Sequence, residues 1–191
     1  MTQYYTGVGA RGTPPEAMKQ LQAIGYVLKD LGVILRSGGA LGADTAFWEG
    51  VVEWYKGIND VSSKRPEGIY LPWEGFNGYN TWNQWGCFKT VEQMGVEQEA
   101  RNIASVIHPA WYRCREGAQK MHSRNVLQVL GDDLKTPSDL LVCWAEVDHA
   151  GIPKGGTATA WNLAVREGIP CFNINVDGHS ELLEEFISDR L

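Results

Sequence analysis

Five short runs of apolar and β-branched residues stand out along the chain. These runs, at 3–8, 33–37, 67–73, 138–145 and 170–174, are the candidate strands. The fourth run, "SDLLVCWA", is almost continuously apolar, which is typical of a strand covered on both faces of its sheet. The pattern therefore predicts a sheet with helices packed on both sides.

Apolar residues between the strands recur at the spacing of amphipathic helices. In the first helix they are Met18, Leu21, Ile24, Leu28 and Leu31. Thr13 and Glu16 stand just before it at the spacing of a capping box, and Pro14 and Pro15 suit a first helical turn. The other expected helices are 44–57, 90–108, 109–131, 156–168 and 179–191. Alternating strands and helices predict one α/β domain over residues 1–191, with three layers and a central, mostly parallel sheet.

Three glycine-rich stretches each lie between a predicted strand and the helix that follows it. They are "GVGARG" (7–12), "SGGALGAD" (37–44) and "PKGGTAT" (153–159). Because the carboxyl ends of parallel strands meet at one edge of a sheet, all three stretches are expected at that edge. A helix N-terminus offers free N–H groups and a positive dipole end, which favour an anion. One such loop is often only a turn, but three at one edge predict a site for a phosphate-bearing ligand.

The familiar nucleotide-binding motifs do not fit. Residues 7–12 spell G-x-G-x-x-G, but Pro14 and Pro15 start the helix too late for the third glycine to lie inside it. The second strand ends in Arg36, where a NAD-binding protein has an acidic residue for the ribose. The phosphate loop G-x-x-x-x-G-K-[ST] is missing as well. A NAD-dependent dehydrogenase is therefore excluded.

Charge and cysteine content narrow the class of protein further. The formal net charge of −6 argues against broad, salt-driven binding to nucleic acid. The chain has four cysteines and no CxxC pair; they are Cys87, Cys114, Cys143 and Cys171. We therefore expect buried free thiols and a protein of a reducing compartment. No apolar stretch is long enough for a signal segment or a membrane span, so a cytoplasmic protein without a membrane partner is expected.

Three motifs in order along the chain, "SGGALGAD", "MHSRN" (121–125) and "GGTAT" (155–159), resemble the SLOG superfamily of Rossmann-like proteins. This superfamily includes the "lonely guy" nucleoside 5′-monophosphate phosphoribohydrolases and the Rossmann domain of DNA-processing protein A. The first motif is closer to the DNA-processing branch, and "MHSRN" resembles the M-H-x-R-K of the phosphoribohydrolases. The resemblance spans residues 4–175 and implies a nucleotide-binding domain of a bacterial or phage protein that forms homodimers or larger homo-oligomers.

Two departures from the phosphoribohydrolases bear on catalysis. Where their glycine motif ends in a glutamate, this chain has Asn162. Their arginine is kept as Arg124, but the lysine that follows it is replaced by Asn125. Cleavage of an N-glycosidic bond builds positive charge on the ribose, which a carboxylate stabilises and an amide does not. Glu146 or Asp148 would have to supply that carboxylate from another direction.

The candidate ligand-binding residues come from the glycine-rich loops and from "MHSRN". They are Gly9, Arg11, Ser37, Gly38, Gly39, Gly42, Asp44, Arg124, Asn125, Gly155, Gly156, Thr157 and Thr159. Backbone N–H groups and hydroxyls would bind phosphate, Arg11 would add charge, and Arg124 would clamp the phosphate and is the candidate catalytic residue. Ser37 would donate to the phosphate or cap a helix, and Asp44 is expected to cap the helix that follows it, with a ribose hydroxyl as its partner in the alternative ligand-binding role.

Other polar clusters carry less information. Arg113, Lys120 and Arg124 fall on one stripe of a predicted helix, which is either a solvated face or directed at the glycine loops. The four histidines lack the spacing of metal ligands, and His122 is expected to pack or to cap. The sequence therefore predicts no metal site, and it implies no cofactor.

An aromatic segment rich in Asn and Gly, at about 73–89, has no counterpart in the short phosphoribohydrolases. Its aromatic residues are Trp73, Phe76, Tyr79, Trp82 and Trp85. They cover a sheet edge, form a subunit interface, or stack on a base as a lid. Coverage or a homodimer contact is the expectation.

Three functions remain open at this point. The missing glutamate favours a protein that binds or senses a nucleotide-derived small molecule, such as a monophosphate, an ADP-ribose-like compound or a cyclic nucleotide. Arg124 favours a nucleoside 5′-monophosphate N-glycosidase. The likeness to the DNA-processing branch favours single-stranded DNA binding, against which the negative net charge counts.

Overall fold

The order and direction of the strands define where a ligand site can form. The computed structural model describes residues 2–59, 65–82 and 85–190, and within these ranges six parallel strands form one sheet in the order β4-β3-β2-β1-β5-β6. Their bounds are β1 Tyr4–Gly9, β2 Ile34–Ser37, β3 Gly68–Leu71, β4 Phe88–Thr90, β5 Leu140–Trp144 and β6 Cys171–Asn173. The order reverses between β1 and β5. In open parallel sheets the carboxyl ends of two such strands flank the crevice where ligands bind.

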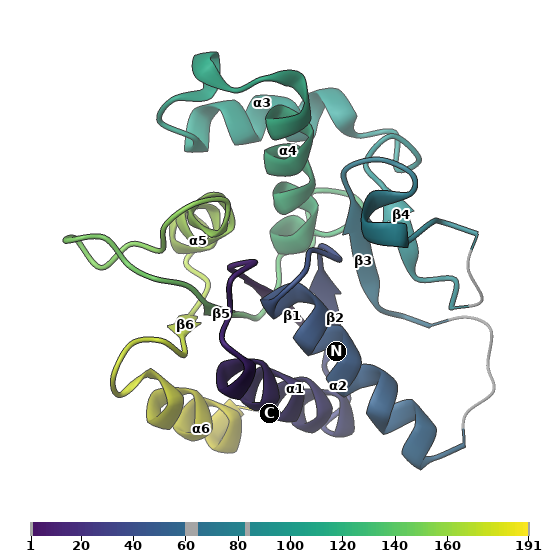
Figure 1. Ribbon diagram of the computed structural model, residues 1–191, viewed down its shortest axis with the longest axis vertical. Coiled ribbons are helices and arrows are strands. Elements are labelled where there is room, and N and C mark those ends of the chain that lie inside the picture. The colour runs from purple at the N-terminus through teal and green to yellow at the C-terminus, as the bar shows by residue number, and fades with distance from the viewer. Residues whose placement is uncertain (1, 60–64, 83–84, 191) are drawn as a thin grey trace.

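Helices cover both faces of this sheet, which confirms the predicted three-layer, Rossmann-like α/β fold (Figure 1). They are α1 Pro15–Asp30, α2 Ala43–Gly57, α3 Glu97–Ile107, α4 Glu116–Leu130, α5 Thr157–Arg166 and α6 His179–Arg190. One core, around Leu35 and Phe47, lies under α1, α2 and α6, and a second, around Leu127 and Leu141, lies under α3, α4 and α5. β5 is buried from Leu140 to Cys143 between them. Within the described ranges, every helix is too short or too polar for a membrane span.

The connection from β3 to β4 contains a short 3-10 turn where parallel strands usually have an α-helix. Phe76, Tyr79 and Trp85 from this aromatic segment pack into the same core as α2. The segment therefore supplies the coverage that was one expectation for it, in place of a helix. Trp82 is 80% exposed, and a homodimer contact through this segment stays a prediction. The three-residue strand β4, at the end of the segment, is not predicted from the sequence pattern.

Two predicted helices are shorter than expected. The helix predicted over 90–108 begins only at Glu97, because β4 takes its first residue and Gly95 adopts a left-handed turn conformation with φ of 69°. The helix predicted over 109–131 is split, because residues 111–113 form a separate 3-10 turn and α4 begins at Glu116. Arg113 consequently does not share a helical stripe with Lys120 and Arg124, and that prediction is wrong.

The capping box predicted before α1 does not form. Pro14 is the N-cap residue of α1, and no side chain caps this helix. The Thr13 hydroxyl donates instead to the Ala10 carbonyl oxygen at 2.6 Å, within the loop after β1. Thr13 therefore stabilises the shape of the first glycine-rich loop and not the start of the helix.

The crossing of α1 and α2 leaves no space for a side chain at Gly50. A Cβ built there would lie 2.1 Å from the Gln22 carbonyl oxygen, a backbone atom that cannot move without the helix. We expect Gly50→Ala to lower the free energy of unfolding by about 1–3 kcal/mol, because the helices must separate. Calorimetry measures the change. The matched control is Gly57→Ala, whose added Cβ would lie 4.0 Å from the Tyr26 hydroxyl and should be tolerated. Equal losses at both positions would contradict the close crossing.

Candidate functional site

A cavity of about 910 Å³ opens at the carboxyl ends of β1 and β5. Its walls come from the loop after β1, the start of α2, the end of α3, one side of α4, and the loop that leads into α5. Nine of the predicted ligand-binding residues line it: Gly9, Arg11, Asp44, Arg124, Asn125, Gly155, Gly156, Thr157 and Thr159. The structure thus brings parts of all three glycine-rich loops to one cavity.

The other four predicted residues do not line the cavity and have structural roles. The Ser37 hydroxyl is fully buried and donates to the Gly7 carbonyl oxygen at 2.6 Å, so it neither faces a ligand nor caps a helix. A Cβ on Gly38 would lie 1.1 Å from Arg124 Nη1, so this glycine makes room for an arginine of the protein itself. Gly39 and Gly42 have φ of 62° and 83° and shape the turn before α2.

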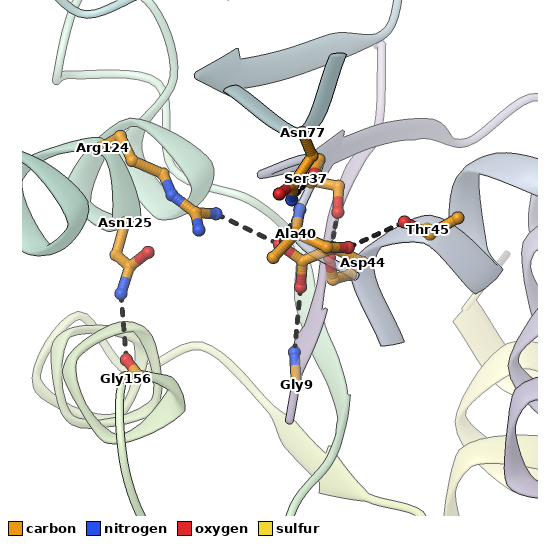
Figure 2. Close-up of polar contacts among 11 residues, drawn as sticks. Gly9, Ser37, Ala40, Asp44, Thr45, Asn77, Arg124, Asn125 and Gly156 are labelled. Atoms are coloured by element: carbon orange, nitrogen blue, oxygen red, sulfur yellow. Dashed lines mark hydrogen bonds and ion pairs between the residues drawn. The ribbon is translucent and has the colours of Figure 1, made fainter. Parts of the chain in front are cut away.

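Asp44 connects the first two glycine-rich loops to α4 (Figure 2). Its carboxylate accepts hydrogen bonds from the Gly9 N–H at 3.2 Å and the Ala40 N–H at 3.3 Å, and it forms an ion pair with Arg124 Nη1 at 3.1 Å. Both charged side chains are 4% exposed. Burial raises the pKa of the Asp44 carboxyl, while Arg124 and the two N–H groups oppose that rise.

The ion pair changes what the second glycine-rich loop can bind. Asp44 is the second residue of α2 and does not cap it, so the capping interpretation is wrong. Its carboxylate instead accepts hydrogen bonds from the Gly9 and Ala40 N–H groups and pairs with Arg124, so these donors are not available to a ligand phosphate. Burial lowers the pKa of Arg124, and the charge of nearby Arg11 adds to that effect, whereas Asp44 opposes it. Arg124 therefore lies at the cavity with its charge already paired, while its Nε has no hydrogen-bond partner among the described residues.

Free donors lie at the start of α5. In the described ranges, the N–H groups of residues 155–157 and the Thr157 hydroxyl donate to no protein acceptor. Gly155 has a left-handed φ of 67° and Gly156 a helical backbone, an alternation that turns successive N–H groups toward one side. From α4, Asn125 Nδ2 donates to the Gly156 carbonyl oxygen at 2.9 Å and fixes this loop. The loop is thus held in place while its N–H groups stay available.

The charges around this helix start are mainly positive. Arg11 is exposed at the cavity, and no ion pair of its guanidinium occurs within the described residues. Lys154 also lines the cavity, and its ammonium lies 3.3 Å from the exposed Glu146. Positive side chains beside unpaired N–H groups at a helix N-terminus form a site suited to an anion.

Neither of the two carboxylates considered for N-glycosidic hydrolysis, Glu146 and Asp148, lines the cavity. Asn162 does line it. Asp148 accepts hydrogen bonds from the N–H groups of Ala150 and Ile152, which lower the pKa of its carboxyl. Among the described lining residues, Asp44 is the acidic side chain, and it is bound to Arg124.

Sequence spacing missed one cluster at the cavity. Donor atoms of His108, Cys114 and His122 lie within 4.8 Å of one another in the described part of the chain. His122 Nδ1 and Thr159 Oγ1 are 2.8 Å apart, and the His108 and His122 ring centroids are 4.3 Å apart. Burial, with His108 and Arg124 nearby, lowers the pKa of His122 to about 4. No sequence signal predicts the cluster, because it depends on how the chain turns between α3 and α4.

Comparison with solved structures supports the class of fold. The chain is similar to DNA processing protein A from Helicobacter pylori, a structure reported for its single-stranded DNA binding mode. The TM-score is 0.53 and the sequence identity 18%, and the match covers 96% of this chain and 72% of that chain. This likeness shows a Rossmann-like fold of the DNA processing protein A type. No protein-family model and no curated protein sequence matches the chain.

Proposed function

We propose that the protein binds a nucleotide or a nucleotide-derived small molecule in this cavity, with a phosphate at the N-terminus of α5. The observation that carries the proposal is the set of unpaired N–H groups at residues 155–157, beside Arg11 and the Thr157 hydroxyl. A helix N-terminus with free donors and a nearby cation favours a phosphate group. The cavity, at about 910 Å³, has the size of a small-molecule site.

The rest of the cavity suits the organic part of such a ligand. Part of the cavity lining is apolar, whereas the loop before α5 is polar. The apolar residues are Trp73, Ile107, Pro109 and Met121. Trp73 lines the cavity and is 42% exposed, which makes its ring the candidate for stacking on a base. Asn162 supports binding without hydrolysis, because an amide does not offset the positive charge of an N-glycosidic transition state as a carboxylate does.

A ligand screen with two arginine variants tests the proposal. AMP, cyclic AMP, ADP-ribose and inorganic phosphate are compared by thermal shift and calorimetric titration, because a ligand specific for the folded state raises its Tm. At least one nucleotide should raise the Tm without release of free base. Arg11→Gln should weaken its binding roughly tenfold, since a charge-assisted hydrogen bond is lost. Arg166→Gln, at the far end of α5, is the matched control. Equal affinity of both variants, or no shift with any nucleotide, would exclude the site.

Single-stranded DNA binding is the second candidate, favoured by the structural likeness to a protein reported to bind such DNA. Trp82 and Tyr112, 80% and 78% exposed, offer surfaces for base stacking. The same samples titrated with an oligothymidylate decide between the two functions. The logarithm of the association constant is plotted against the logarithm of the salt concentration. A negative slope of about −0.7 for each phosphate contacted would favour DNA binding. A small-molecule site predicts negligible oligonucleotide binding.

A further inference from the structure

A cluster of three side chains that can bind a metal, two of which line the cavity, lies beside the first turn of α5. His108 is the C-cap residue of α3, Cys114 directly follows the 3-10 turn at residues 111–113, and His122 lies on α4. Cys114 Sγ and His108 Nδ1 are 3.8 Å apart, and one donor atom from each of the three residues lies within 4.8 Å of the other two. His108 and His122 also line the cavity.

The distances in the cluster match the ligand shell of one metal ion. A tetrahedral zinc ion with Zn–S near 2.3 Å and Zn–N near 2.0 Å separates a sulfur from a nitrogen by about 3.6 Å. The observed separation between Cys114 Sγ and His108 Nδ1 is 3.8 Å, so these two donors are nearly in place. The His122 donor atom lies within 4.8 Å of the other two, and it would have to move closer to complete a shell of one thiolate and two imidazoles.

Each histidine has one ring nitrogen that can bind a metal, and on His108 a metal ion would displace the N–H of Ala110 from that nitrogen. The Ala110 N–H donates to His108 Nδ1 at 3.2 Å, which identifies Nδ1 as the nitrogen that carries the lone pair. On His122, Nδ1 is paired with the Thr159 hydroxyl at 2.8 Å, so Nε2 is the nitrogen available for a metal. Second partners of this kind orient metal-binding imidazoles. Thr159 would act as such a positioning residue.

We propose that His108, Cys114 and His122 bind one zinc-class divalent ion, with its fourth coordination position open to the cavity. A thiolate with two imidazoles selects borderline-soft ions such as Zn²⁺ over Mg²⁺ or Ca²⁺. Three protein ligands leave one position for water or for an oxygen of a bound ligand, which is the pattern of open zinc sites. This site shares no ligating residue with the phosphate site at α5, so either can exist without the other.

The test uses Co²⁺ and Zn²⁺ alone, added to the full chain under reducing conditions. Tetrahedral Co²⁺ bound by a thiolate gives visible d–d bands and a near-ultraviolet sulfur-to-cobalt charge-transfer band. We expect one Co²⁺ per chain, displaced by Zn²⁺, and a rise in Tm with Zn²⁺. Cys114→Ser should abolish the charge-transfer band. Thr159→Val should weaken metal binding by roughly tenfold or more, because His122 loses its orienting partner.

Matched variants separate this site from adventitious metal binding. Cys171→Ser removes a half-buried thiol from β6, and His149→Ala removes an imidazole from the loop after β5. Both should keep the full Co²⁺ spectrum. A wild-type spectrum without the charge-transfer band, or one that Cys114→Ser and His122→Ala leave unchanged, would overturn the proposal. Nucleotide binding is not part of the readout, so failure of the ligand screen does not affect this test.

Discussion

Asp44→Ala should destabilise the protein by about 3–5 kcal/mol, the usual cost of a buried charge that loses its partner. The substitution leaves the Arg124 guanidinium buried with its carboxylate removed, and it frees the N–H groups of Gly9 and Ala40. Chemical denaturation followed by circular dichroism measures the loss. Arg124→Met should cost less, because the Asp44 carboxylate would keep its two backbone donors.

A double variant tests whether this loss comes from the charge. Asp44→Asn/Arg124→Met replaces the ion pair by uncharged groups of similar volume, and it should recover most of the stability lost in Asp44→Ala. Glu16→Gln breaks an exposed pair with Lys19 and is the control, with an expected change below about 1 kcal/mol. If Asp44→Ala were as mild as Glu16→Gln, the loops at the sheet edge would not depend on the buried pair.

Much of the fold follows from local sequence pattern. Five of the six described strands and the alternation with helices are visible because apolar periodicity and glycine positions are local properties. The strand β4 is missed because its three residues follow an aromatic segment that resembles a loop. The late start of α4 is missed because Pro109 suits a helix start, whereas the chain forms a 3-10 turn first.

The candidate site also has one part that the sequence predicts and one part that it does not. The convergence of the glycine-rich loops is predictable, because parallel topology brings the carboxyl ends of strands to one edge. The pairing of Asp44 with Arg124 is not, since the two residues are 80 positions apart and meet only after α4 packs on the sheet. The His108, Cys114 and His122 cluster likewise depends on tertiary structure. Sequence thus locates the loops, but it does not show which donors an internal side chain already occupies.

The second large effect is expected at Glu67, far from the cavity. Its side chain is fully buried and accepts hydrogen bonds from Lys29 Nζ at 2.7 Å and from the Tyr55 hydroxyl at 3.1 Å. These contacts join α1, α2 and the segment before β3. Glu67→Gln keeps the shape and a partner for Tyr55 but leaves the ammonium of Lys29, 10% exposed, without its counter-charge. We expect a loss of about 3–5 kcal/mol in the free energy of unfolding.

The double variant Lys29→Met/Glu67→Gln shows whether charge or shape causes that loss. Methionine keeps the apolar stem that packs near the Tyr55 ring, over which Lys29 Nζ lies at 4.6 Å from the centroid. The double variant should be more stable than Glu67→Gln alone, because the ammonium of Lys29 is no longer buried without its counter-charge. Denaturation at several salt concentrations gives a second check, since a buried pair is screened far less than a surface pair. A double variant no more stable than Glu67→Gln would mean that the network acts through packing and not through its charges.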